Sequence, residues 1–259
     1  MEYGICSLSV IPLRSDLSDR SEMISQLLFG DLFIIMENNG KWAKVRLLDD
    51  NYEGWLDVKQ ISSLDETTYH ELRNSKVRYT LNPVDVVQEV TTSRSFPVVM
   101  GSSIRNMDNG RFRIGNTEYE FSGNVTDPDV QPDREQLVEH ALVFMNAPYL
   151  WGGKTLFGID CSGFTQMAYK LCGIFLLRDA HEQASIGETM NLLHEAAPGD
   201  LLFFNDAEGQ IIHTGIYLGD NRIIHASGKV RIDQVDHQGI FNKEKKGYTH
   251  SLRLIKKIL

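Results

Sequence analysis

Short apolar stretches separated by turn residues fill the first half of the chain and constrain its fold more than any other feature. The segments LLFGDLFIIMENNGKWAKVRL (residues 27–47) and YEGWLDVKQI (residues 52–61) alternate apolar and polar residues, as half-buried strands do. Asn39-Gly40 predicts a hairpin turn, because both residue types tolerate positive φ. Residues 1–63 are therefore expected to form a small β-barrel.

A second group of short strands is expected after a polar connector at residues 64–76, which would be a helix or a turn. The stretches VRYTL, FPVVM, FRIG and YEF follow between Val77 and Val125, and Gly101, Asn109-Gly110 and Gly115-Asn116 separate them as turns. This spacing predicts a second barrel over residues 64–128. It would be divergent, because the tryptophans of the first segment have no counterpart there.

The remainder, residues 129–259, has a different pattern. Asp133 is a candidate N-cap with Gln136 three residues later, and REQLVEHALVFMNA carries apolar residues at helical spacing. Another helix is expected after it, and residues 201–204, 211–218 and 222–226 are strand candidates. Helices followed by strands predict an α+β unit.

The composition excludes several classes of function. The formal net charge is −9, which argues against a nucleic-acid partner and weakly against docking on an anionic surface. The chain shows neither a transmembrane stretch nor, in MEYGICSLSV, a signal peptide. We therefore expect a cytoplasmic protein if this N-terminus is native, and a periplasmic or secreted one if a signal peptide has been removed. Neither a Cys-x-x-Cys nor a His-Glu-x-x-His pattern occurs, so we expect no metal and no organic cofactor.

One of the three cysteines has an unusual setting. Cys161 lies in GIDCSGF, among small and polar residues, where Asp160 or Ser162 can cap a helix that starts here. Free backbone N–H groups in the first turn favour a thiolate, so a lowered thiol pKa is expected. Cys172 lies further along the same predicted helix, and Cys6 lies in the first predicted strand. Both have apolar neighbours and are expected in the core.

Two histidines could activate that cysteine. His213 and His225 flank a turn at residues 219–221. A three-residue loop would pair Leu218 with Arg222 and place His225 opposite Gly215, with His213 one diagonal step away on the same face. A loop with an even number of residues would separate them. On this interpretation His213 accepts the thiol proton and His225 orients it; the alternative is two half-buried strand histidines satisfied by backbone groups.

The last third of the chain resembles the NlpC-type cysteine peptidases (the NlpC/p-sixty family). The blocks that carry the resemblance, in order, are PYLWGG (148–153), DCSGF (160–164), RDAHEQ (178–183), PGDL (198–201), HTGIY (213–217) and IHA (224–226). The resemblance covers residues 133–259. It implies a reduced papain-like fold that cleaves amide bonds in bacterial cell-wall peptides, typically between γ-D-glutamate and a diamino acid.

Specific roles follow from the same resemblance. It implies that Cys161 is the nucleophile, His213 the base and His225 the orienting residue. Tyr149 would help to stabilise the oxyanion, which a tyrosine hydroxyl can do by donating a hydrogen bond. Asp160 and Ser162 would line the substrate pocket.

The first barrel resembles bacterial SH3-like domains, through Gly30-Asp31, the Trp42–Val45 stretch and Gly54-Trp55-Leu56. Together the three regions resemble γ-D-glutamyl-L-diamino acid endopeptidases of the dipeptidyl-peptidase VI type, which have two barrels before an α+β papain-like catalytic domain. In that group the first barrel closes the cleft, so that only peptides with a free N-terminal L-alanine fit. Candidates for binding that end of the peptide are Glu22, Tyr52 and Asp179. Ala180 stands where the group tends to have serine, which leaves the contacts of the γ-glutamyl carboxylate open.

Three functions are therefore weighed. The first is an endopeptidase of murein recycling that releases L-Ala-γ-D-Glu from free murein peptides, with no obligate protein partner. The second is a secreted wall hydrolase whose barrels bind intact peptidoglycan. The third is a non-catalytic binding module, which the intact Cys161, His213 and His225 disfavour.

Overall fold

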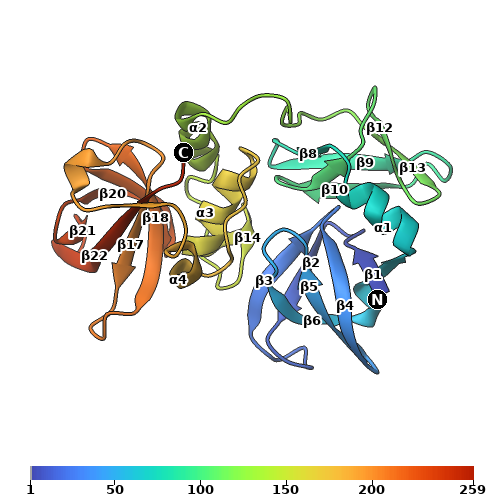
Figure 1. The fold of residues 1–259 in the computed structure, drawn as a ribbon, viewed down its shortest axis with the longest axis horizontal. Coiled ribbons are helices and arrows are strands. Elements are labelled where there is room, and N and C mark those ends of the chain that lie inside the picture. The colour runs from blue at the N-terminus through green and yellow to red at the C-terminus, as the bar shows by residue number, and fades with distance from the viewer. Residues whose placement is uncertain (1) are drawn as a thin grey trace. The chain divides into compact units, whose positions relative to one another are not determined.

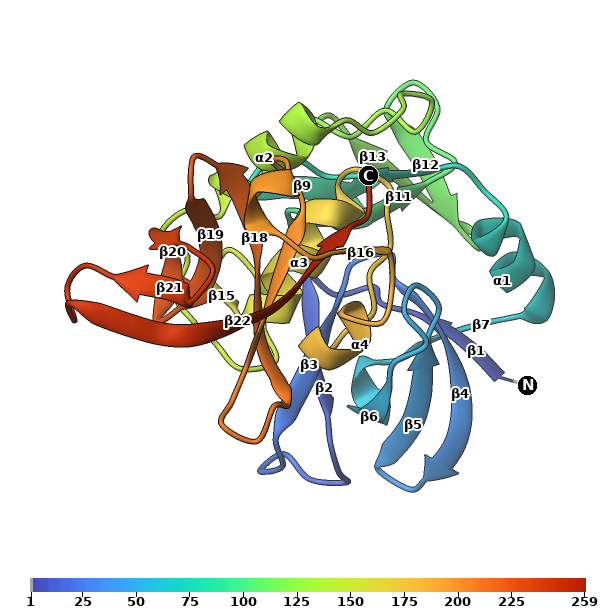
Figure 2. The same ribbon diagram turned by 60° about the vertical axis from the view of Figure 1, so that its left-hand side comes forward.

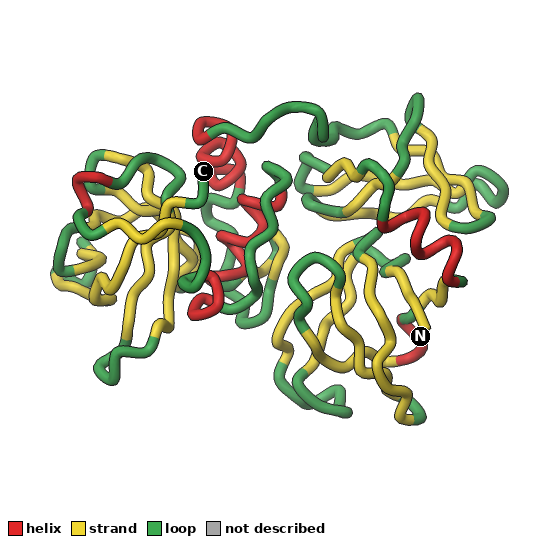
Figure 3. The backbone as a smooth tube through the Cα atoms, in the orientation of Figure 1, coloured by secondary structure: helices red, strands yellow, loops and turns green. Residues whose placement is uncertain are grey.

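The computed structural model describes residues 2–259, which divide into two compact units, one ending at Val130 and the other comprising Gln131–Leu259. Figure 1 draws the first unit in blue to green and the second in green to red. The first consists almost entirely of strands and loops, whereas the second combines helices with a sheet (Figure 3). In the described part of the chain, residues 2–259, no helix is long and apolar enough to cross a membrane.

The first unit begins with a seven-stranded antiparallel sheet of order β3-β2-β6-β5-β4-β1-β7. Its elements are β1 (Glu2–Ile5), β2 (Val10–Arg14), β3 (Met23–Leu28), β4 (Leu32–Asn39), β5 (Trp42–Leu47), β6 (Glu53–Asp57), η1 (Val58–Gln60) and β7 (Ser62–Leu64). Buried apolar side chains from β2 to β6, with Cys6, form its core. The predicted hairpin exists, but Asn39 pairs with Trp42, so its turn is Gly40-Lys41, one residue later than expected. Gly40 has φ +61.

A helix and two smaller sheets complete this unit. They comprise α1 (Glu66–Arg73), β8 (Val77–Tyr79), β9 (Val84–Glu89), β10 (Ser95–Val99), β11 (Ser103–Arg105), β12 (Arg111–Ile114) and β13 (Thr117–Phe121). One sheet has the order β10-β9-β13-β12 and the other pairs β11 with β8. The turns predicted at Asn109-Gly110 and Gly115-Asn116 are present, whereas β9 and β11 were not predicted from the sequence. A second barrel over residues 64–128 stays a prediction.

The turn between β3 and β4 ties the two parts of this unit together. Phe29 is fully buried in the core of the second part, among Val87, Val98 and other side chains. The backbone N–H of Ser103 donates to the Phe29 carbonyl at 2.7 Å, and the Ser103 hydroxyl lies 3.1 Å from Asp31 Oδ1. A side chain at Gly30 would meet the Ser103 carbonyl oxygen, so only glycine permits this close contact.

The second unit places helices against a strongly curved sheet. Its helices are α2 (Arg134–Val143), α3 (Cys161–Lys170), α4 (Ala180–Gln183) and η2 (Leu193–Glu195). Its strands are β14 (Lys154–Thr155), β15 (Gly158–Ile159), β16 (Glu188–Met190), β17 (Leu201–Asn205), β18 (Ile211–Gly219), β19 (Arg222–Ser227), β20 (Lys229–Val235), β21 (Gly239–Asn242) and β22 (Gly247–Lys257). Helices α2, α3 and α4 all contact β18 (Figure 1).

The large sheet has the order β16-β22-β17-β18-β19-β20-β21, and β22 also pairs with β21. Strands β17 to β22 therefore close into a barrel, because the long β22 reaches from β21 to β17 and on to β16 (Figure 2). Its interior holds Leu202, Tyr217, Ile223 and Val235, with other apolar side chains. The helices followed by strands, and β17, β18 and β19, agree with the sequence-based prediction; the closing strands β20 to β22 were not predicted.

Candidate active site

Cys161 is the first residue of α3, as predicted. The carboxylate of Asp160 caps the helix by accepting the backbone N–H of Gly163 at 2.7 Å. Backbone N–H groups of Ser162 and of Thr214, the residue after His213, hydrogen-bond to the sulfur. The helix start thus places the thiol against β18, next to one of the two candidate histidines.

The two flanking residues are held by a buried arginine. Arg178 is almost fully buried and lies 2.6 Å from Asp160 Oδ2. It also donates to the Ser162 hydroxyl at 2.9 Å. Asp160 accepts in addition from the backbone N–H of Gly152 at 2.8 Å. Asp160 and Ser162 therefore have a structural function at the helix start, and their predicted contact with substrate stays a prediction.

The two histidines meet inside the barrel. Nε2 of His213 lies 2.8 Å from Nδ1 of His225, and both side chains are buried. The loop that joins their strands differs from the expected three-residue loop, which was wrong. Gly219 pairs with Arg222, so the turn is the two-residue Asp220-Asn221, with positive φ at both.

A bulge at Leu218 compensates for this even loop. The register shifts between Tyr217 and Gly219, and Tyr217 pairs with Ile223. Continuing that register places Gly215 opposite His225, the predicted pair. A two-residue loop alone would put His213 and His225 on opposite faces of the sheet. The extra residue of the bulge reverses this, so both histidines lie on the same face.

Three neighbours of the histidines were missed in the sequence. Asp233 on β20 lies with Oδ2 3.0 Å from Nε2 of His225. Arg231 lies 2.7 Å from the same oxygen. The His250 ring stacks on His213, with centroids 4.2 Å apart and planes inclined by 23°. These three residues lie on β20 and β22, which were not predicted from the sequence. Without a strand assignment, the sequence does not show which residues a polar side chain faces.

The thiol is not the depressed-pKa group that its helix position predicts. Burial raises the pKa of Cys161 to about 11, and the Asp160 carboxylate adds to this effect, although the N–H groups of Thr214 and Ser162 oppose it. Burial likewise holds the pKa of His213 well below its usual value, with further contributions from His225 and His250. The expected lowering of the thiol pKa was therefore wrong, because burial disfavours the charged form of the thiol.

Tyr149 is half-buried beside this pair. Burial raises the pKa of its hydroxyl to about 12, and the neighbouring Cys161 and Asp160 act in the same direction. The hydroxyl therefore stays protonated at neutral pH and can donate a hydrogen bond. This is the property that its predicted oxyanion role requires.

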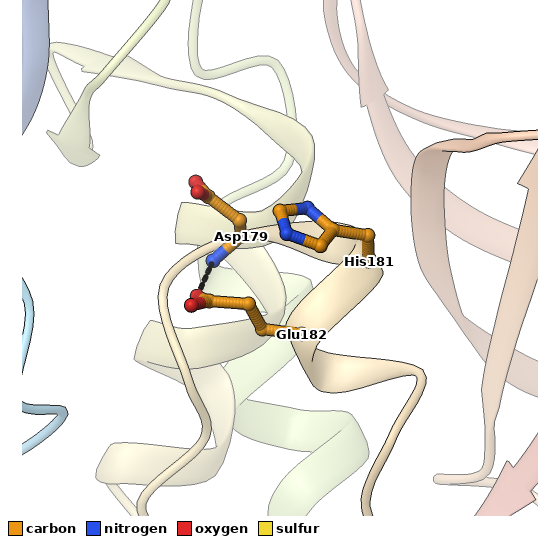
Figure 4. A group of neighbouring side chains, drawn as sticks. All are labelled: Asp179, His181 and Glu182. Atoms are coloured by element: carbon orange, nitrogen blue, oxygen red, sulfur yellow. Dashed lines mark hydrogen bonds between the residues drawn. The ribbon is translucent and has the colours of Figure 1, made fainter.

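Asp179 precedes α4, where its backbone N–H donates to Glu182 Oε2 at 3.1 Å (Figure 4). The ligand-type atoms of Asp179, His181 and Glu182 lie within 4.8 Å of one another. The Glu182 carboxylate is already engaged in capping the helix, which accounts for its place in this group. The predicted contact of Asp179 with substrate stays a prediction.

Glu22 and Tyr52 belong to the first unit. Glu22 is exposed just before β3, and its carbonyl accepts the Ser15 N–H at 2.9 Å. Tyr52 is partly buried and packs against the core of the first sheet. Their roles in binding a free amine stay predictions.

The other two cysteines differ from each other. Cys6 is fully buried in the first sheet's core, as expected. Cys172 lies beyond the end of α3 and is only partly buried, with its sulfur 3.5 Å from His140 Nδ1. Because it is only partly buried, Cys172 is not the core residue that was expected. Burial still raises the pKa of its thiol to about 11, so the thiol is a weak nucleophile.

Comparison with known proteins agrees with this geometry. Residues 146–248 match the NlpC/P60 family, and residues 13–61 match the bacterial dipeptidyl-peptidase SH3 domain. A thiol at a helix start beside a buried histidine pair defines a cysteine peptidase, and the chain belongs to the NlpC/P60 family of cysteine peptidases.

Particular relatives extend the similarity to most of the chain. This chain is 30% identical over 216 residues to the gamma-D-glutamyl-L-lysine dipeptidyl-peptidase of Bacillus subtilis, and the match covers 78% of this chain and 71% of the relative. It is 28% identical over 241 residues to the dipeptidyl-peptidase 6 of Lysinibacillus sphaericus, covering 84% and 86%. The crystal structure of an NlpC/P60 family protein from Bacillus cereus has the same fold, with a TM-score of 0.84, 20% identity and 99% of each chain covered.

Proposed function

We propose that this protein hydrolyses the bond between γ-D-glutamate and a diamino acid in murein peptides with a free N-terminal L-alanine, releasing L-Ala-γ-D-Glu. The observation that carries the chemistry is the Cys161 sulfur at a helix start, hydrogen-bonded by the backbone N–H of Thr214, the residue after His213, whose Nε2 is engaged by His225. The substrate class is supported by the relatives named gamma-D-glutamyl-L-lysine dipeptidyl-peptidase and by the matching SH3 domain.

The reaction proceeds through an acyl-enzyme. As the sulfur of Cys161 attacks the γ-glutamyl carbonyl carbon, His213 takes the thiol proton at Nδ1, the ring nitrogen that His225 leaves available. The Tyr149 hydroxyl donates to the developing oxyanion. The C–N bond then breaks and His213 returns the proton to the leaving amine. A water deprotonated by His213 attacks the thioester carbonyl, the C–S bond breaks, and the departing thiolate of Cys161 takes the proton back from His213.

We propose Glu22 as the group that binds the free amine. A carboxylate suits this role because a charge-assisted hydrogen bond to an ammonium is about twice as strong as a neutral one. Acetylation of the amine removes that charge, so the acetylated peptide should bind far more weakly.

The deciding experiment compares the tripeptide L-Ala-γ-D-Glu-diaminopimelate with its N-acetylated form. We expect hydrolysis of the free peptide and a large loss of kcat/KM on the acetylated one. Cys161→Ala should abolish hydrolysis, whereas Cys172→Ala, the matched loss of another thiol of the same unit, should retain it. Equal rates on both peptides would exclude the amine requirement, and strong retention on purified sacculi would favour the wall hydrolase instead.

Glu22→Gln tests the assigned contact. We expect KM for the free peptide to rise about 10-fold or more, with kcat changed less, because the lost ion pair contributes to binding of the ammonium. Glu37→Gln, at an exposed position of β4, is the matched control. An unchanged KM in Glu22→Gln would remove Glu22 from the site.

A further inference from the structure

A line of polar side chains crosses three adjacent strands of the barrel. His213 lies on β18, His225 on β19 and Asp233 on β20. Gly215 faces His225, and Asp233 pairs with Ile223, so each step of the line is one diagonal position across the sheet. These residues alternate in phase with Tyr217, Ile223 and Val235, which line the apolar interior. The line is therefore buried in a medium of low polarity.

Hydrogen bonds join every member of the line. His213 Nε2 lies 2.8 Å from His225 Nδ1, and His225 Nε2 lies 3.0 Å from Asp233 Oδ2. Each histidine therefore uses one ring nitrogen toward the next residue of the line. Only Nδ1 of His213 remains for Cys161.

The carboxylate at the end of the line stays charged. Burial opposes the charged form of Asp233, but hydrogen bonds from His225 and Arg231 outweigh it and lower the pKa of the carboxyl group. Arg231 Nη2 donates to Asp233 Oδ1 at 3.0 Å, and Glu244 in turn lies 3.3 Å from Arg231. An ionised carboxylate only accepts hydrogen bonds, so His225 must carry its proton on Nε2.

The remaining protons follow from that constraint. With its Nε2 proton directed at Asp233, His225 presents Nδ1 to His213 as a hydrogen-bond acceptor. His213 then carries its proton on Nε2, and Nδ1 is left with a free lone pair. The other titratable groups that face the pair are Cys161 on α3 and His250 on β22, whose pKa burial lowers to about 4. His250 is therefore neutral and supplies no competing charge.

We propose that Asp233 is a positioning residue that fixes the tautomers of both histidines and so keeps Nδ1 of His213 free to take the proton of Cys161. It acts through His225 and does not touch the thiol. During the reaction its charge also stabilises the imidazolium that forms on His213, through the same two hydrogen bonds. The inference rests on the proposed roles of Cys161 and His213, but not on the proposed substrate.

The unmodified protein provides the first test. In 15N-detected NMR of histidine side chains at neutral pH, we expect both His213 and His225 to be protonated at Nε2 and unprotonated at Nδ1. A protonated Nδ1 on either ring would overturn the proposal. This measurement needs neither a substrate nor a variant, so it decides the matter even if peptide hydrolysis is not the activity.

Asp233→Asn provides the second test, because it removes the charge while nearly preserving shape. We expect kcat to fall about 10²–10⁴-fold with KM little changed, as when the carboxylate that orients a catalytic histidine is neutralised. The rate of Cys161 alkylation by iodoacetamide should fall as well. Asp220→Asn is the matched control, in an exposed turn where asparagine accepts the same positive φ, and it should leave both rates unchanged.

The melting temperature separates positioning from loss of fold. Asp233→Asn removes a partner of Arg231 and is expected to melt somewhat earlier, yet to remain folded at the assay temperature. Unchanged kcat and unchanged alkylation in the folded variant would overturn the proposal. If the variant does not fold, the NMR tautomers of the unmodified protein still decide it. If the wild type cleaves no murein peptide while alkylation still depends on Asp233, the proposed substrate fails and the positioning role stands.

Discussion

The imidazoles of His213 and His225 meet at 2.8 Å although their backbones are one diagonal step apart, because the residue opposite His225 is Gly215. A Cβ at Gly215 would lie 2.8 Å from the Cβ of His225, closer than carbon atoms pack. The absent side chain is therefore what lets the ring of His225 reach across to His213.

Gly215→Ala should displace His225 and weaken that hydrogen bond. We expect a loss of kcat together with a fall of about 1–3 kcal/mol in the free energy of unfolding, as for overpacked core sites. Kinetics and chemical denaturation measure the two effects. Gly247→Ala, where a Cβ would meet nothing closer than 4.0 Å, is the control; equal behaviour of the two variants would contradict this role of Gly215.

The reactivity of Cys161 should depend on pH in a characteristic way. Because burial raises its pKa to about 11, the rate of alkylation by iodoacetamide should climb steadily from about pH 6 to pH 10, since the thiolate is the nucleophile. Mass spectrometry distinguishes this site from Cys6 and Cys172. A rate already at its plateau below about pH 7 would instead indicate a resting thiolate–imidazolium pair.

Removing the hydroxyl of Tyr149 tests its place beside the reacting carbonyl. Tyr149→Phe should lower kcat about 10²–10³-fold and change KM little, because the donor acts on charge that develops only in the transition state. Tyr248→Phe removes another hydroxyl, one that donates to Asp236 at an exposed position, and should retain full activity. A normal kcat in Tyr149→Phe would require a different oxyanion donor.

The ion pair of Asp160 and Arg178 should contribute strongly to stability. Asp160→Asn keeps a residue able to cap α3 but leaves the buried Arg178 without its counter-charge, so we expect a loss of about 3–5 kcal/mol in the free energy of unfolding. Urea denaturation gives the value. The exposed pair of Asp220 and Arg222 supplies the comparison, since Asp220→Asn should cost at most about 1 kcal/mol; similar losses in both variants would refute the difference.

Acid should destabilise the fold in two stages. Burial lowers the pKa of His213 and takes that of His250 to about 4, whereas unfolded histidine titrates near about 6.5. The unfolded chain therefore binds more protons below about pH 6.5, and stability falls from there toward the folded pKa values. The lowered pKa of Asp233 adds stability that is present above about pH 4 and is lost on further acidification.

His250→Phe isolates part of the first stage. Phenylalanine can stack on His213 without titrating, so the melting temperature of this variant should fall less steeply between about pH 7 and pH 5 than that of the wild type. The exposed His194 is the control, because His194→Phe should leave the slope unchanged. An unaltered slope in His250→Phe would mean that other groups account for the acid sensitivity.

Much of the site could be predicted because its signals are local. Asp160 caps a helix that starts at Cys161, and strands β17, β18 and β19 follow their apolar patterns. The pairing of His225 opposite Gly215 was right even though the loop was wrong, since the Leu218 bulge restored the phase. A bulge leaves no reliable trace in a single sequence.

By itself the sequence determined where α2 and α3 start, where β17 to β19 lie, which cysteine stands at a helix start and which two histidines share a face of the sheet. Only the tertiary structure decided that the pKa of that thiol is raised, because burial outweighs the effect of the helix start. Only the structure revealed Asp233 as well. Arg231 and Asp233 lie on the face of β20 that points into the barrel, but in the sequence alternating charged residues look the same whether they face the interior or solvent. Partners such as Phe29 in the core of a second sheet likewise depend on distant contacts, which no local pattern encodes.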